Sequence, residues 1–217
     1  MHFENCSRAD GSCWCEIRRY LPVLALTILL CAGEVIGGYI SHSFALMADA
    51  VHVSMDAVAI LSSLCIIPLI RRWKQHEMRI RVAGGYVQAL LLAMAAAWIA
   101  VEAFERLHNL QNIQSATMML TATAGLFGNY WQHQLLSRAK FTDARDITRK
   151  ALDRHVLSDL AQSVGVILGG IAIALTGWIW IDPALSIAIA CLMACWVVKI
   201  LYESAHTGST HPFKHTH

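Results

Sequence analysis

Three side chains that can bind a metal ion lie close together in one apolar segment of this sequence. They are Asp49, His52 and Asp56, in the stretch ADAVHVSMDAVA. Because His52 and Asp56 are four residues apart, a helix would place them one above the other on the same face. The same spacing recurs about a hundred residues later, where His155 and Asp159 occur in HVLSDLAQSVGVILGG. Two matched pairs can supply four ligands to one ion.

Two His and two Asp suit Zn²⁺, which prefers four tetrahedral ligands drawn from imidazole nitrogen, carboxylate oxygen and thiolate. An ionisable side chain in the hydrocarbon of a membrane costs at least ~2.5–3.5 kcal/mol, so several of them on one helix face indicate function. A single His in such a helix is more often a hydrogen-bonding partner for a neighbouring helix. The repetition of the pair in a second apolar segment favours a metal site made of His52, Asp56, His155 and Asp159.

The composition requires that these residues be positioned by membrane helices. The chain has 217 residues, of which 56% are hydrophobic and only 15% charged, and its mean hydropathy is +0.48. A helix needs ~20 apolar residues to cross a bilayer. Six such spans are predicted, at Leu21–Ile40, Phe44–Ile70, Val82–Val101, Ala116–Leu136, Val156–Trp178 and Pro183–Leu201. We therefore expect an all-α integral membrane protein with six transmembrane helices.

The basic residues predict the orientation, because Lys and Arg in short loops stay on the cytoplasmic side. All of them except Arg106 fall before the first span, in the last turn of the sixth span or after it, or in the loops that follow the second and fourth spans. Both termini are therefore predicted to be cytoplasmic. The expected organisation is a cytoplasmic arm at residues 1–19, a six-helix membrane domain at 20–203 and a short His-rich tail at 204–217. The net charge of +2 reflects this loop asymmetry and gives no reason to expect nucleic acid as a partner.

The seven cysteines do not indicate a disulfide framework. Four lie within predicted spans, where Cys behaves as a small apolar residue. The other three, Cys6, Cys13 and Cys15, lie in the arm on the reducing side of the membrane. Metal capture by this arm, or by the four His of the tail, is an alternative to simple disordered ends.

Polar residues near the paired motifs are candidates for a pathway or for support of the ligands. Asp49, one turn outward of His52, would either help the ion leave or hydrogen-bond a ligand. Asn129 in the fourth span is expected to hydrogen-bond between helices rather than to bind the ion. Glu34 in the first span is interpreted as a side chain that extends to the outer surface, with proton relay or pairing to a neighbouring helix as alternatives.

The two pairs do not lie at the same depth of their apolar runs. His52 and Asp56 fall near the middle of the second span, whereas His155 and Asp159 lie at the inner end of the fifth, a mismatch of the order of 15 Å at 1.5 Å per residue. A shared site therefore requires the fifth helix to continue beyond its apolar run on the cytoplasmic side, with water reaching the pairs from there.

The chain resembles the cation diffusion facilitator family of divalent-metal transporters over all six spans. The resemblance rests on the paired His-x-x-x-Asp motifs, on SHSFALMADAVHVSMDAVA and HVLSDLAQSVGVILGG around them, and on WIAVEAFERL, GLFGNYWQHQLL and TGWIWIDPALS. It implies efflux of Zn²⁺ by a metal/proton antiporter that works as a homodimer in the lipid bilayer, with His52, Asp56, His155 and Asp159 as the transport site. It also implies a multi-pass protein of the bacterial inner membrane.

Two features depart from the family pattern. Members usually carry a cytoplasmic domain after the sixth span, whereas here a short tail is expected. Dimer contacts would then come from the membrane helices, or dimerisation would be absent. Arg81 stands where the family usually has a carboxylate, so the resemblance does not imply an inner-gate ion pair at this position.

The expected mechanism is competition between protons and metal for the same lone pairs. A ligating His must be neutral and a ligating Asp ionised, and His has a reference pKa of about 6.5, so a more acidic outer compartment would eject the ion during alternating access. Zn²⁺ is then the transported substrate, and no organic cofactor is expected.

Alternatives are transport of Co²⁺, Ni²⁺, Cd²⁺, Fe²⁺ or Mn²⁺, and a non-transporting metal sensor or subunit. A membrane metallohydrolase is disfavoured because the sequence has no His-Glu-x-x-His, so the chain is not expected to be an enzyme.

Overall fold

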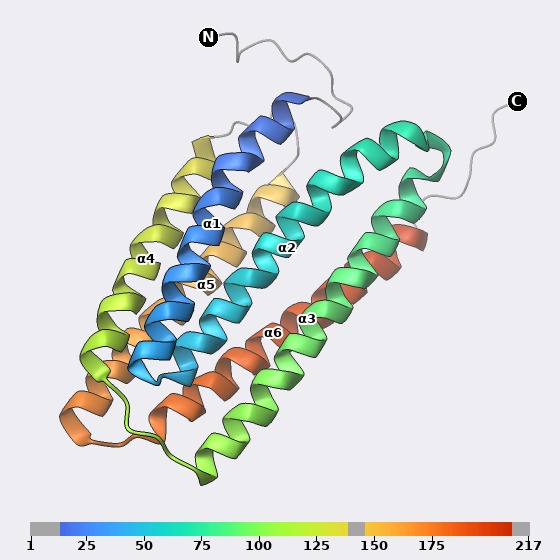
Figure 1. The fold of residues 1–217 in the computed structure, drawn as a ribbon. Helices are drawn as coiled ribbons and strands as arrows, with labels where there is room; N and C mark the ends of the chain where they lie inside the picture. The colour runs from blue at the N-terminus through green and yellow to red at the C-terminus, as the bar shows by residue number, and fades with distance from the viewer. Residues whose placement is uncertain (1–13, 139–145, 210–217) are drawn as a thin grey trace, which may run out of the picture.

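The computed structural model describes residues 14–138 and 146–209, which form six long α-helices and one short 3₁₀ turn (Figure 1). The helices are α1 (Trp14–Ser41), α2 (Phe44–Arg72), α3 (Glu77–His108), α4 (Ser115–Arg138), α5 (Asp146–Thr176) and α6 (Ile181–Ser209), and η1 (Lys74–His76) lies between α2 and α3. Only the backbone is described at residues 14–20, 63, 67, 70, 71, 74, 77, 133, 135–138, 146–157 and 207–209. Each predicted span coincides with one of these helices.

The described helices form an all-α integral membrane protein. Five of them, α1, α2, α3, α5 and α6, contain stretches long and apolar enough to cross a bilayer. Helix α4 has 24 residues, which is also sufficient length, but polar residues such as Thr121, Asn129 and Gln134 dilute its apolar character. Large apolar side chains point outward, and Leu175 is 81% exposed, while Glu34 and Asp49 are buried. This distribution is the one expected where lipid surrounds the bundle.

Successive helices run in opposite directions (Figure 1). The start of α1, the end of α6 and the connection from α2 to α3 lie at one end of the bundle, here called the terminal end. The turns from α1 to α2 and from α5 to α6 lie at the opposite end, here called the far end. The first and last helices therefore begin and finish on one side, as the sequence predicts. That this side is cytoplasmic stays a prediction from the basic residues.

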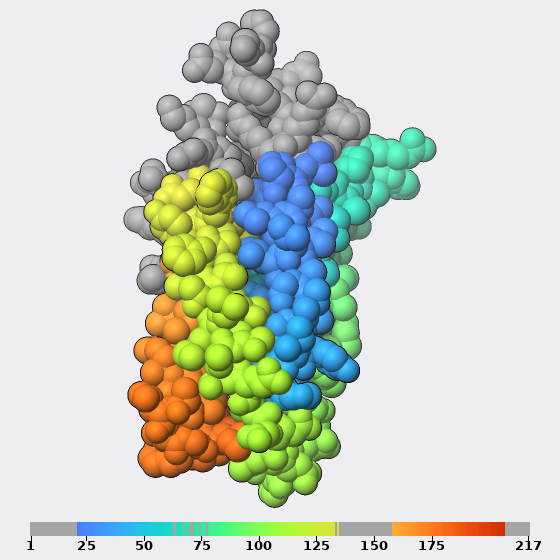
Figure 2. Space-filling view, turned by 60° about the vertical axis from the view of Figure 1, so that its left-hand side comes forward, coloured from blue at the N-terminus to red at the C-terminus, as the bar shows by residue number. Residues whose placement is uncertain are grey.

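Helix α2 lies at the centre of the bundle, between two groups of helices. Helix α1 packs against α2 and α4, α4 packs against α5, and α3 packs along α6; α2 also contacts α3, α5 and α6. Figure 2 shows α1 (blue) lying against α4 (yellow to green). A Cβ atom at Gly37 of α1 would collide with Thr121, and one at Gly128 of α4 would collide with Leu30. These two glycines thus allow the close approach of α1 and α4.

The start of α2 is fixed by a carboxylate from the other end of the sequence. Asp182, in the first turn of α6, accepts hydrogen bonds from the Ser43 hydroxyl (2.5 Å) and from the backbone N–H groups of Phe44 (2.8 Å) and Ala45 (3.2 Å). The Ser43 hydroxyl in turn accepts from the N–H of Leu46 (3.2 Å). Asp182 is 2% exposed, so its charge faces the N-terminal dipole of α2 out of water.

We expect Asp182→Ala to destabilise the folded protein by about 2–3 kcal/mol, since it leaves several buried donors at the start of α2 without an acceptor. The measurement is thermal unfolding of the purified chain in detergent, with Glu105→Ala as the control because Glu105 is an exposed carboxylate of α3. Equal unfolding temperatures for the two variants would contradict this role of Asp182.

Candidate metal site

Helices α2 and α5 bring three potential metal ligands together in the middle of the bundle. His52 and Asp56 come from α2 and Asp159 from α5, and one ligand atom from each lies within 4.8 Å of the others. The Nε2 atom of His52 is 3.2 Å from Oδ1 of Asp159 and 4.0 Å from Oδ2 of Asp56. Among the described residues this is the one such group of His, Cys, Asp and Glu.

The local helix geometry explains why these side chains converge. His52 and Asp56 lie on one face of α2 because they are one turn apart. Asp159 reaches them because α5 begins at Asp146, well before its apolar run at Val156. The fifth helix therefore does extend beyond the apolar run, as a shared site requires, and the depth mismatch expected from hydropathy disappears.

The fourth predicted ligand, His155, lies in α5 one turn before Asp159, but its side chain is outside the described residues. Its part in the site stays a prediction. The Cys and His residues of the two terminal arms also lie outside the part of the chain that the structure describes.

The three candidate ligands form an electronegative, largely enclosed site. The side chain of His52 is 3% exposed, whereas those of Asp56 and Asp159 are 24% and 16% exposed. Two carboxylates and one imidazole supply oxygen and nitrogen donors and up to two negative charges, which suits a divalent cation such as Zn²⁺. The partial exposure of the two carboxylates means that an ion can reach them.

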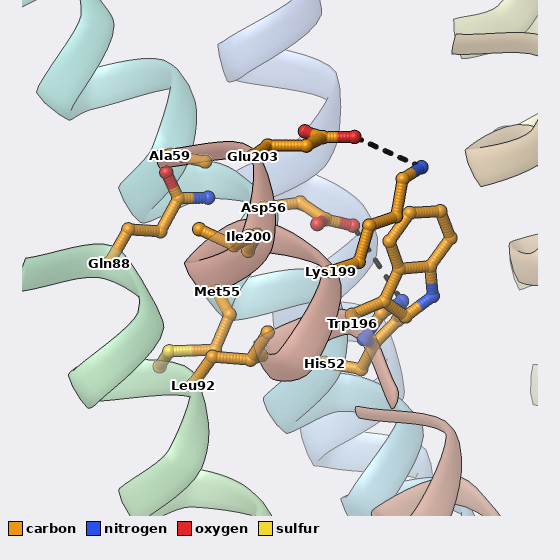
Figure 3. A pocket seen from close by; sticks show the side chains of 10 residues that line it. All are labelled: His52, Met55, Asp56, Ala59, Gln88, Leu92, Trp196, Lys199, Ile200 and Glu203. Atoms are coloured by element: carbon orange, nitrogen blue, oxygen red, sulfur yellow. Dashed lines mark ion pairs between the residues drawn. The ribbon is translucent and has the colours of Figure 1, made fainter. Parts of the chain in front are cut away.

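A cavity of about 240 Å³ leads to this site (Figure 3). His52 and Asp56 line its inner part, and it extends between α2, α3 and α6 toward the terminal end. Lys199 lines it as well, with Nζ 4.0 Å from Oε1 of Glu203 and 4.3 Å from the centre of the Trp196 ring. The cavity is lined by His52, Met55, Asp56, Ala59, Gln88, Leu92, Trp196, Lys199, Ile200 and Glu203.

The auxiliary residues predicted from the sequence lie outside the group of three ligands. Asp49 is 2% exposed and lies one turn before His52 on α2. Asn129 of α4 donates a hydrogen bond from Nδ2 to the Ser163 hydroxyl of α5 (3.4 Å), which links two helices. The interpretation of Glu34 as a surface-seeking side chain is wrong, because it is 1% exposed. Gly125 of α4 leaves the space in which the Glu34 carboxylate lies.

The wall of the cavity could not be identified from the sequence. Gln88, Trp196 and Glu203 lie on α3 and α6, and only the packing of these helices against α2 brings them near His52. One signal was available for Lys199, since a basic residue inside an apolar segment is costly unless it serves a purpose.

Comparison with known proteins shows similarity to cation efflux proteins. The family model described as "Cation efflux transmembrane domain" matches residues 21–207. The chain is 35% identical over 194 residues to the zinc transporter ZitB of Pectobacterium atrosepticum, covering 87% of this chain and 60% of the relative. It is 36% identical to the metal cation efflux system protein CzcD of Cupriavidus metallidurans, covering 81% and 55%.

A third relative is the cadmium, cobalt and zinc/H(+)-K(+) antiporter of Bacillus subtilis, which is 27% identical over 85% of this chain and 62% of its own length. The chain thus spans about 60% of the length of these curated relatives.

Proposed function

The chain belongs to the cation efflux family, and from this premise we propose that it exports a divalent metal ion, Zn²⁺ first among them, in exchange for protons. It is a multi-pass protein of the bacterial inner membrane, and its relatives are transporters rather than enzymes. The observation that carries the proposal is the meeting of His52, Asp56 and Asp159 at the inner end of a cavity within a membrane bundle.

In this proposal the ion is held by four ligands, with His155 joining the three described side chains. His155 has the register for this role, because it precedes Asp159 by one turn of α5. Two imidazoles and two carboxylates would complete a tetrahedral shell and neutralise the charge of a divalent ion. A site that closes around the ion from two different helices can also open when those helices move apart.

The cavity is the proposed route of entry. It runs from the ligands toward the terminal end of the bundle, which the basic residues predict to be cytoplasmic. In this proposal, the structure represents the state that takes up an ion from the cytoplasmic side. Release would require the opposite opening, toward the far end, as alternating access demands.

Proton exchange follows from the chemistry of the ligands. His must be neutral and Asp ionised to bind metal, so binding releases protons and protonation releases metal. An ion bound at cytoplasmic pH would therefore be displaced when the site opens to a more acidic compartment. The name of the Bacillus relative, an antiporter that includes H⁺, supports this assignment.

Zinc is proposed as the principal ion on two grounds. A mixed nitrogen and oxygen ligand set in tetrahedral geometry suits Zn²⁺, and the ZitB relatives are named zinc transporters. Ligand type alone does not exclude Co²⁺, Ni²⁺ or Cd²⁺, because such sites follow the general order of divalent affinities, and two of the relatives' names include other metals or metal cations in general.

The test is zinc uptake into proteoliposomes that contain the purified chain, with an imposed pH gradient and an internal zinc-sensitive dye. We expect zinc to accumulate against the outward flow of protons, and a dye for pH to report that flow only when zinc is present. Co²⁺, Cd²⁺ and Mn²⁺ are compared under the same gradient. If every ion accumulates no faster than in empty liposomes while the chain still binds zinc, the transport proposal is contradicted and a sensing role is favoured.

A further inference from the structure

Among the described residues outside the site above, three polar side chains that are more than nine-tenths buried have polar atoms without a hydrogen-bond partner. They are Glu34 of α1, Asp49 of α2 and Gln162 of α5, which are 1%, 2% and 7% exposed. Both carboxylate oxygens of Glu34, Oδ2 of Asp49 and both amide atoms of Gln162 are buried and make no hydrogen bond. Buried polar groups are nearly always satisfied in folded proteins, so a group of unsatisfied ones indicates a missing ligand or counter-charge.

The three residues lie on one side of the metal ligands. Asp49 precedes His52 by one turn on α2, and Gln162 follows Asp159 by one turn on α5. Because α2 and α5 run in opposite directions, both steps lead toward the far end of the bundle (Figure 1).

Glu34 lies at a similar level to Asp49. It is about 10 Å from the end of α1, and Asp49 is about 8 Å from the start of α2, at 1.5 Å per residue. Helices α1 and α2 are in contact at this level, where the Cys31 thiol donates a hydrogen bond to the carbonyl oxygen of Ala50 (3.5 Å). None of Glu34, Asp49 and Gln162 lines the cavity on the other side of the ligands.

The surroundings of Glu34 provide space for its carboxylate but no described Lys or Arg as a counter-charge. A Cβ atom at Gly125 of α4 would lie only 2.6 Å from Oε1 of Glu34, so this glycine is what allows the carboxylate to lie there. No described Lys or Arg forms an ion pair with Glu34 or Asp49. Two buried carboxylates without a Lys or Arg partner are costly, and a divalent cation would compensate both charges at once.

We propose that Glu34, Asp49 and Gln162 form a second binding station for a divalent cation, one helical turn beyond the transport site on the way to the far end. Two carboxylates and an amide oxygen are suitable ligands for Zn²⁺, Co²⁺ and Mn²⁺. The station binds the ion when the transport site opens toward the far end. The ion is therefore coordinated by polar side chains as it leaves His52, Asp56 and Asp159. Its role in export rests on the proposed function, whereas its capacity to bind an ion does not.

Equilibrium binding of Zn²⁺ to the purified full chain in detergent tests the station directly. The double variant Asp56→Asn/Asp159→Asn removes two ligands of the transport site. We expect wild type to bind about two ions per chain and this double variant about one, since each ligand set holds one ion. Adding Glu34→Gln to the double variant is expected to abolish the remaining binding, whereas adding Glu105→Gln, at an exposed position on α3, is expected to leave it.

Two binding results would overturn the station. The first is that the double variant binds no ion, which would mean that Glu34 and Asp49 are protonated instead of binding metal. The other is a remaining ion that survives Glu34→Gln. Circular dichroism and gel filtration of each variant show that the chains compared are folded. Because the readout is binding, this result stands even if the chain proves not to transport zinc.

A transport measurement then tests the place of the station in the cycle. Glu34→Gln alone is expected to reduce the maximal rate of zinc transport about tenfold with little change in KM, because it acts after the ion has been captured. A rise in KM at an unchanged maximal rate would instead place Glu34 on the entry side and refute the proposed order.

Discussion

Asp159→Ala is expected to reduce zinc transport by more than about 100-fold, because loss of an outer-shell partner alone costs 10–100-fold in metal affinity or activity and this residue is placed as a direct ligand. The substitution removes the one described ligand that α5 contributes, 3.2 Å from Nε2 of His52. It also removes a negative charge that offsets the divalent ion. Asp56→Ala on α2 should have an effect of the same size, because both carboxylates belong to one shell.

The two variants together test whether the site is shared between helices. Transport into proteoliposomes is the measurement, with Glu105→Ala on α3 as a control for the loss of a carboxylate elsewhere. If Asp159→Ala transports zinc at the control rate while Asp56→Ala is inactive, the ion is held by α2 alone and the pairing of α2 with α5 has another purpose.

The positions of the helices were predictable from hydropathy, but the start of α5 was not. Hydropathy detects the part of a helix that lies in lipid, and the segment DITRKALDRH before the fifth apolar run is too polar to be detected in this way. Helix formation depends instead on propensity, and most of these residues are compatible with a helix. The matched His-x-x-x-Asp pairs nevertheless required this extension, so a functional pattern predicted a boundary that composition could not.

The error at Glu34 shows what a single helix pattern leaves undetermined. The sequence places Glu34 near the outer end of the first span, where a long side chain can usually reach water. Whether it does so depends on which neighbour covers it, and that neighbour is α4, whose Gly125 lies some ninety residues later in the chain. The rotation of α1 within the bundle therefore decides whether the carboxylate lies inside or outside.

The cavity was likewise not predictable from the sequence, because its walls come from three helices. His52 and Asp56 on α2 are recognisable by their spacing, while Gln88 on α3 and Trp196 on α6 follow no pattern that relates them to α2. The long contact between α3 and α6 places both beside α2. A transport site can thus be predicted from its ligands, whereas the route to it requires the tertiary structure.

That route leads to a second prediction with a large expected effect, at Ala59. This residue lines the cavity on α2, about 10 Å from His52 at 1.5 Å per residue, and lies near Gln88 of α3 and Glu203 of α6 in Figure 3. A bulky group attached at Ala59 would fill much of a cavity of about 240 Å³. Since the width of a pathway decides what passes through it, we expect such a group to stop the ion without touching its ligands.

The experiment replaces the native cysteines, introduces Ala59→Cys and adds a membrane-impermeant thiol reagent. Labelling is expected to reduce zinc transport to about a tenth or less of the unlabelled rate, because the path is narrowed. Labelling should occur only when the reagent is on the side of the terminal end. If that end is cytoplasmic, as predicted, the reagent will label Ala59→Cys in inside-out vesicles. Gln75→Cys, an exposed position between α2 and α3 at the same end, should be labelled without loss of transport. Normal transport by fully labelled Ala59→Cys would mean that the ion reaches His52 and Asp56 by a path that avoids this cavity, so that the entry route would have to be sought between other helices.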